Sequence, residues 1–138
     1  MNDAFVVLHM NRDSGLPPTI ADGLVRACKA TVGGDLRSIT YFDPERERQL
    51  YLRDDLTAAA DIEGFAEHER HGFRSQSAYA HSELGSYRFT IRAFDRGYLL
   101  RVIVADLGAF VTTDELSVER FVELANAVEA ILTKQANV

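Results

Sequence analysis

The residues best suited to chemistry in this chain lie in the stretch EHERH at residues 67–71. Imidazole and carboxylate groups are metal ligands, and His81 could add a third imidazole to this stretch. The zinc-protease pattern requires two histidines four residues apart with a glutamate after the first, whereas His68 and His71 are three apart. A histidine pair on the solvated face of a helix explains the stretch better, so we predict neither a metal site nor a cofactor.

No other stretch carries a motif for catalysis. The chain has no G-x-S-x-G nucleophile elbow, no Walker loop and no G-x-G-x-x-G fingerprint. Gly33-Gly34 precedes a predicted strand, whereas a phosphate-binding loop opens a helix. Five carboxylates gather at the ends of one predicted hairpin, where charged turns are routine: Asp43, Glu45, Glu47, Asp54 and Asp55. The sequence therefore predicts that the protein is not an enzyme.

The composition is that of one soluble domain of 138 residues with a net charge of -6. This acidic balance does not favour binding to nucleic acid or to an anionic membrane. The only cysteine, Cys28, falls on the apolar side of a predicted helix, where we expect a buried and inert thiol. The apolar block at residues 5–8 is too short for a signal peptide or a membrane span. We therefore expect a cytoplasmic protein.

The elements that would position any site are organised around a predicted β-hairpin at residues 86–105. Its first half alternates apolar and polar residues, and the apolar run 98–105 indicates a central strand. Asp95-Arg96-Gly97 is predicted as the turn, in which Gly97 is free to take a positive φ. Pairing Asp95 with Tyr98 gives one face that is wholly apolar and that we expect in the core: Phe89, Ile91, Ala93, Leu100, Val102 and Val104.

The opposite face of this hairpin is the candidate functional surface. In the same register Arg92 lies opposite Arg101, and like charges in this position destabilise a sheet. Two interpretations stay open: a solvated face with its guanidinium groups in water, or a face covered by an acidic helix, a partner subunit or a bound anion. Arginine beside exposed apolar residues is the composition of an interface core. The candidate interface or anion-binding residues are Arg88, Arg92, Phe94, Leu99 and Arg101.

The remaining elements follow from periodicity and from capping residues. Helices are predicted at residues 19–32, around residues 62–71 with Gly72 as the end, and from a cap at Ser117 to the C-terminus. Strands are predicted as a hairpin of residues 36–43 and 48–53 and as a short edge strand at 77–80. For residues 108–113 two alternatives stay open: this segment continues the sheet or crosses its edge.

These elements predict an α+β fold. A single antiparallel sheet of about five strands would carry three helices in the order α-β-β-α-β-β-β-α. Residues 1–16 are expected to form an N-terminal extension or an edge strand, and residues 17–138 a single domain.

This order of elements resembles the profilin-like arrangement of roadblock/dynein-light-chain domains over about residues 17–135. The resemblance implies a domain that dimerises and serves as a platform or regulator for small GTPases and motor complexes. We therefore predict a non-catalytic interaction or regulatory domain that forms a homodimer and binds an unidentified protein. PAS and GAF sensor domains share related elements and are the alternative; Tyr87, Phe89, Val102 and Val104 beside Cys28 and Tyr41 would then line a ligand cavity. A secretion-chaperone-like fold is a third possibility.

Several stretches also resemble small proteins of haloarchaea. These are LRSITYF, QLYLRDDL, ELGSYRFTIR and residues 109–116. The 13 arginines against only two lysines agree with a GC-rich genome and with a salt-loving host. This resemblance implies a provenance and no activity.

Overall fold

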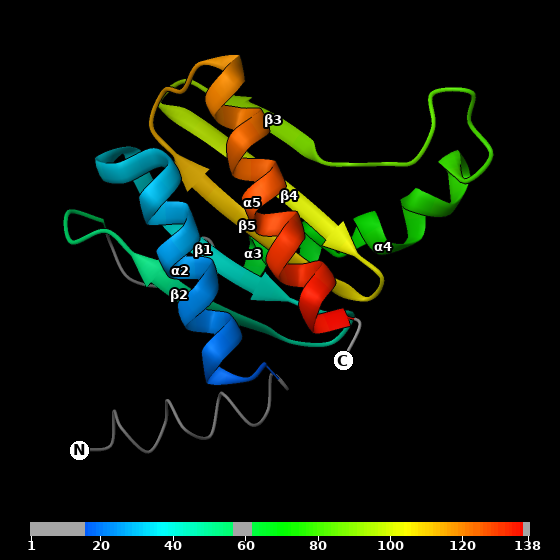
Figure 1. Cartoon of the computed structure of the whole chain (residues 1–138), viewed down its shortest axis with the longest axis horizontal. Coiled ribbons are helices and arrows are strands. Elements are labelled where there is room, and N and C mark those ends of the chain that lie inside the picture. Colours follow the sequence, from blue (N-terminus) through cyan, green and yellow to red (C-terminus); the bar gives the residue numbers. More distant parts are fainter. Residues whose placement is uncertain (1–15, 57–61, 137–138) are drawn as a thin grey trace.

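A five-stranded antiparallel sheet, in the order β2-β1-β5-β4-β3, is the centre of the fold (Figure 1). The computed structural model describes residues 16–56 and 62–136. The strands are β1 (Leu36–Phe42), β2 (Glu47–Leu52), β3 (Thr90–Phe94), β4 (Gly97–Val104) and β5 (Leu107–Thr113). The helices are α2 (Pro18–Val32), α3 (Ile62–Glu69), α4 (His71–Ser75) and α5 (Val118–Ala136), with 3-10 turns η1 (Gly33–Asp35) and η2 (Gln76–Tyr79). The predicted α+β class and element order are confirmed.

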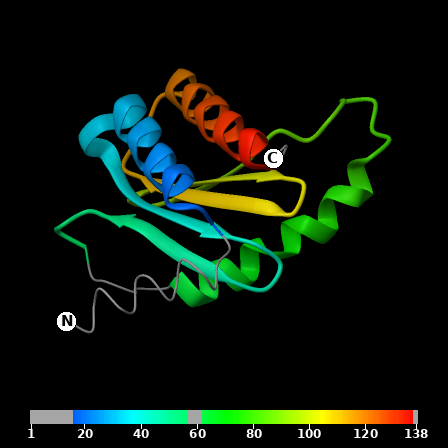
Figure 2. The same ribbon diagram turned by 60° about the horizontal axis from the view of Figure 1, so that its bottom comes forward.

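Helices α2 and α5 cover one face of the sheet (Figure 2). Pro18 begins α2, where a missing N–H costs nothing, and Gly33 ends it with a φ of 57°. The predicted cap of α5 is confirmed, because Ser117 Oγ accepts a hydrogen bond from the Arg120 N–H. Within the described residues, no helix is both long and apolar enough to span a bilayer.

The main core lies between these two helices and the sheet. Leucine, valine and alanine side chains recur along α2 and α5 at helical spacing and meet the inward residues of the strands. The fully enclosed members of this cluster include Leu24, Cys28, Val32, Ile39, Leu100, Val102, Val111, Leu124, Val128 and Leu132. Burial of this apolar surface is the main term that holds the helices to the sheet.

Helix α3 covers part of the opposite face (Figure 2). Phe42 and Phe110 of the sheet pack there with Ala66 and Phe65 of α3. The prediction that Gly72 ends this helix is wrong, since α4 and η2 continue the helical path to Tyr79. The predicted strand at residues 77–80 is therefore also wrong: no periodic apolar face marks this segment, and 3-10 turns occupy it instead.

The β3–β4 hairpin has a different register from the predicted one. Phe94 pairs with Gly97, so the turn is Asp95-Arg96, and Arg92 lies opposite Leu99. The pairing is displaced by two residues, so each side chain stays on its predicted side of the sheet. The displacement also removes the predicted repulsion between Arg92 and Arg101. The predicted inner face is only partly interior: Leu100 and Val102 are buried, whereas Ile91 and Ala93 at the sheet edge are exposed.

Gly97 does not use its freedom to take a positive φ. Its role is steric, since a Cβ at this position would lie 2.2 Å from the carbonyl oxygen of Thr113 on β5. Strand β5 continues the sheet between β1 and β4, as one of the two predicted alternatives had it. The predicted N-terminal extension or edge strand lies outside the described residues, except for the buried Leu16.

Candidate functional site

A buried carboxylate on α3 joins the two strand arginines of the predicted functional surface. Glu69 accepts hydrogen bonds from Arg92 at 2.7 Å and from Arg101 at 3.1 Å. The Glu69 side chain is 2% exposed and that of Arg101 is 8% exposed. The hydrogen bond to Glu69 raises the pKa of the Arg92 guanidinium. This part of the surface is thus covered by an acidic helix of the same chain, one of the three covers considered above.

The guanidinium group of Arg101 has further partners that fix its position. Its Nη2 donates to Thr90 Oγ1 at 2.8 Å, across the hairpin, and the Tyr87 hydroxyl donates to the Arg101 carbonyl oxygen. Gly72 in α4 makes room for this group, because a Cβ there would lie 2.5 Å from Arg101 Nη1. Arg101 therefore anchors α3 and α4 to the sheet.

The other predicted interface residues separate from this network. Leu99 is buried with Phe110 beneath α3, whereas Phe94 is 55% exposed at the end of β3. Arg88 lies before β3 and donates a hydrogen bond to Asn126 of α5. The five residues predicted as one surface thus belong to a buried anchor, a strand edge and a contact with α5.

Exposed apolar residues concentrate on β3 and on the segment that leads into it. Tyr79 and Leu84 lie in this segment, which projects beyond the sheet in both views, and Leu84 is 95% exposed. Ile91 and Phe94 lie on β3 itself, where they are 40% and 55% exposed. The further exposed large apolar residue in the described part of the chain is Val118, at the start of α5.

The histidines do not converge. The His68 and His71 rings lie 5.9 Å apart on the exposed surface of α3 and α4, and His81 lies in the projecting segment. The described residues contain no group of three or more His, Cys, Asp or Glu side chains that could hold a metal ion.

The predicted carboxylate cluster is divided among local contacts. Asp43 Oδ1 accepts the N–H groups of Glu45 and Arg46 and so closes the β1–β2 turn. Glu47 pairs with Arg70, and Asp55 pairs with Arg53 at 2.6 Å. These contacts fit the structural role that charged hairpin ends usually have.

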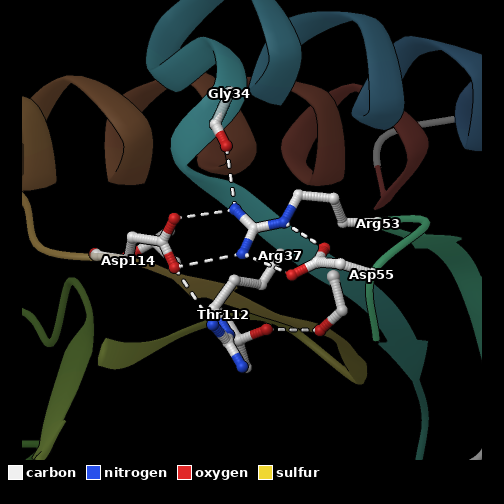
Figure 3. A network of polar contacts seen from close by, with 8 residues as sticks. Gly34, Arg37, Arg53, Asp55, Thr112 and Asp114 are labelled. Atoms are coloured by element: carbon white, nitrogen blue, oxygen red, sulfur yellow. Dashed lines mark hydrogen bonds and ion pairs between the residues drawn. The ribbon is translucent and has the colours of Figure 1, made fainter. Parts of the chain in front are cut away.

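A polar network at one end of β1, β2 and β5 was missed in the sequence. Arg53 donates to Asp114 at 2.7 Å, to Asp55 and to the carbonyl oxygen of Gly34, while Arg37 donates to the same Asp114 at 3.0 Å (Figure 3). Hydrogen bonds from Arg53 and Arg37 hold the pKa of Asp114 below its usual range, and Arg53 does the same for the pKa of Asp55. The only sequence signal was the position of these charges at strand ends.

A pocket of about 390 Å³ lies beside this network, on the face of the sheet that α3 covers only in part. Hydroxyl groups of β1 and β5 line its floor. Among them, Thr112 (labelled in Figure 3) is hydrogen-bonded to Ser38. Thr40 Oγ1 is buried and has no hydrogen-bond partner among the described residues. The apolar walls of the pocket are Leu52, Leu56, Phe65, Phe94 and Phe110.

This pocket is not the cavity that the sensor-domain alternative predicted. Val102 and Cys28 lie in the closely packed core under α2 and α5, on the opposite face of the sheet. Burial raises the pKa of the Cys28 thiol to about 12, so the thiol is neutral and unreactive at physiological pH, in agreement with the expected inert cysteine.

A family model with the description "Domain of unknown function (DUF7522)" matches residues 22–133, from the first turns of α2 to near the end of α5. The chain belongs to this family. The match covers every strand of the sheet, so DUF7522 corresponds to the fold described above. Comparison with curated proteins gives no match.

Solved structures with the same fold as this DUF7522 domain include several MglB proteins. The gliding protein MglB from Thermus thermophilus has a TM-score of 0.60 at 12% identity, over 86% of this chain and 93% of that one. An MglB with a tetrameric arrangement gives 0.58 at 13% identity, over 86% and 94%. MglB from Myxococcus xanthus gives 0.56 at 12% identity, over 84% and 94%. At this identity the likeness shows the fold alone, and it confirms the predicted roadblock-like architecture.

Proposed function

We propose that this DUF7522 domain is a non-catalytic regulatory domain of the cytoplasm that self-associates through the edge of β3. The observation that carries the proposal is the position of β3 at the end of the sheet, where among the described residues it pairs with β4 on one side only and exposes Ile91 and Phe94. An unprotected edge strand is a template for pairing with another strand. Apolar residues beside it supply the surface that such pairing buries.

A second copy of this chain is the occupant that fits the edge best. Antiparallel pairing of β3 with its own copy around a two-fold axis would extend the sheet without a new element. Leu84 and Tyr79, which are exposed in the projecting segment before β3, would add apolar contact area. The opposite edge, β2, is protected: the ion pair between Glu47 and Arg70 ties it to the α3–α4 corner, and charged edges resist pairing.

The fold supports the same role. One MglB has a tetrameric arrangement, which supports self-association. The resemblance of the element order to roadblock domains implies, in addition, a protein partner such as a small GTPase. The contacts of Arg92 and Arg101 with Glu69 leave these two residues to stabilise the chain itself. The β3 edge, together with the segment before it, is therefore the surface that we assign to self-association.

Light scattering coupled to size exclusion tests the proposal. The wild type should be a dimer or a larger assembly, and Ile91→Asp should shift it to the monomer because pairing of the β3 edges would bury the new charge. Val118→Asp is the matched control, since it places the same charge on another exposed apolar residue and should leave the assembly unchanged. A wild type that stays monomeric at high concentration contradicts the proposal.

Hydrogen exchange gives a second measurement that does not depend on a variant. Backbone amides of β3 should become more protected as the protein concentration rises, because pairing shields them. Peptides from β2, the other edge of the same sheet, serve as the internal control and should not change. Equal protection of both edges at every concentration would show that the assembly, if present, uses another surface.

A further inference from the structure

The pocket beside Phe65 and Phe94 has the form of a small-molecule site. Its volume of about 390 Å³ lies within the range of roughly 300–1,000 Å³ that ligand pockets occupy. Apolar side chains from β5, α3 and β3 surround a floor of strand hydroxyl groups. Apolar walls with a few convergent polar groups are the usual composition of a ligand site.

The floor of the pocket contains a polar group that the fold leaves unsatisfied. The side chain of Thr40 is completely buried, and its hydroxyl has no hydrogen-bond partner in the described part of the chain. Buried hydroxyl groups are nearly always hydrogen-bonded, and an unpaired one destabilises the fold. Ser38 and Thr112, the neighbouring hydroxyl groups, already bond to each other. A ligand oxygen, or a water carried with it, would complete this floor.

The mouth of the pocket carries an available positive charge. Arg96 lies in the β3–β4 turn and lines the pocket, and its exposed side chain has no ion pair or hydrogen bond within residues 16–56 and 62–136. Arg37 also lines the pocket, but Asp114 accepts a hydrogen bond from it at 3.0 Å. A guanidinium group next to an apolar pocket selects a ligand with an anionic group, since charge-assisted hydrogen bonds to Arg are strong and directional.

We propose that this pocket binds a small amphipathic carboxylate, with its apolar part between Phe65, Phe94 and Phe110 and its carboxylate group at Arg96. This site goes beyond the proposed self-association and does not require it. Because Phe94 belongs both to the pocket and to the β3 edge, the tests below leave Phe94 unchanged.

The test uses octanoate and 1-octanol, which share an apolar chain and differ in the charged group. Octanoate should bind the wild type, measured by calorimetry, about tenfold more tightly than 1-octanol, which corresponds to roughly 1.4 kcal/mol. Arg96→Gln should reduce the affinity for octanoate by about tenfold and leave that for 1-octanol unchanged. Arg26→Gln, at an exposed arginine of α2, is the matched control and should change neither affinity.

Methyl NMR on the wild type locates the site without a variant. Octanoate should shift the methyl signals of Leu52 and Leu56, which line the pocket, and leave those of Val128 in the α5 core in place. Absence of binding, equal affinity for both probes, or shifts elsewhere would overturn the proposal. Light scattering on the same samples keeps the two proposals separate, because a monomer that binds octanoate refutes self-association alone.

Discussion

Arg101 on β4 donates a hydrogen bond from Nη1 to Oε1 of Glu69 on α3 at 3.1 Å, and both side chains are almost completely buried. Removing one partner of a buried pair leaves an uncompensated charge. Glu69→Ala should therefore lower the free energy of unfolding by about 3–5 kcal/mol in urea denaturation. Glu67→Ala, at an exposed carboxylate of the same helix, is the control and should change it by less than about 0.5 kcal/mol.

The double variant Glu69→Leu with Arg101→Met distinguishes the loss of the pair from the loss of packing. Apolar residues of similar size often replace a buried ion pair without loss of stability. We expect this variant to recover most of the stability that Glu69→Ala loses. If Glu69→Ala were as stable as the wild type, the pair would not anchor α3.

The Asp114 network predicts a dependence of stability on pH. Hydrogen bonds from Arg53 and Arg37 lower the pKa of Asp114 in the folded protein. The stabilisation is therefore complete above the unfolded pKa of about 3.9 and is lost as the pH falls through the folded pKa. Asp114→Asn should lower the melting temperature by about 2–4 °C at pH 7, and the difference should close in acid. Glu123→Gln, on the exposed side of α5, should show no such dependence.

Ala105 is the only non-glycine residue with a positive φ in the described part of the chain, at 57°. It is the first residue of the two-residue turn between β4 and β5, a position that favours glycine. Ala105→Gly should stabilise the protein by about 0.5–1 kcal/mol, because the strain on Cβ exceeds the entropy cost of glycine. The same substitution at the exposed Ala130 in α5 should destabilise it by about 1 kcal/mol. Urea midpoints of the two variants should move in opposite directions.

Gly108 allows the Phe42 ring to lie against β5. A Cβ at Gly108 would lie 2.4 Å from Cζ of Phe42, a distance that real contacts do not reach. Gly108→Ala should destabilise the protein by about 1–3 kcal/mol. Gly34→Ala is the control, because a Cβ there meets nothing within 4 Å. Adding Phe42→Leu to Gly108→Ala should restore part of the lost stability, because the smaller side chain makes room for the new Cβ. If stability is not restored, the contact with Phe42 is not the cause of the loss.

The local elements were largely predictable because their signals are local. The apolar spacing of residues 19–32, the cap at Ser117 and the alternation in residues 36–43 each depend on neighbours in sequence, and the structure confirms each within a few residues. Errors arose where the signal was weak. Gly72 looks like a helix end, yet the glycine is needed there because Arg101, which is distant in sequence, passes against it.

The sequence alone determined an antiparallel sheet with helices, a buried thiol and a surface where arginine meets apolar residues. Only the tertiary structure decided which elements cover that surface and which part of it stays exposed. Glu69 reaches Arg92 and Arg101 only after α3 folds back onto the sheet, and β3 becomes an edge only when β5 takes the place between β1 and β4. Periodicity reports which side of an element is apolar, whereas partners distant in sequence are fixed by packing. That is why the anchor, the free edge and the pocket emerge from the fold.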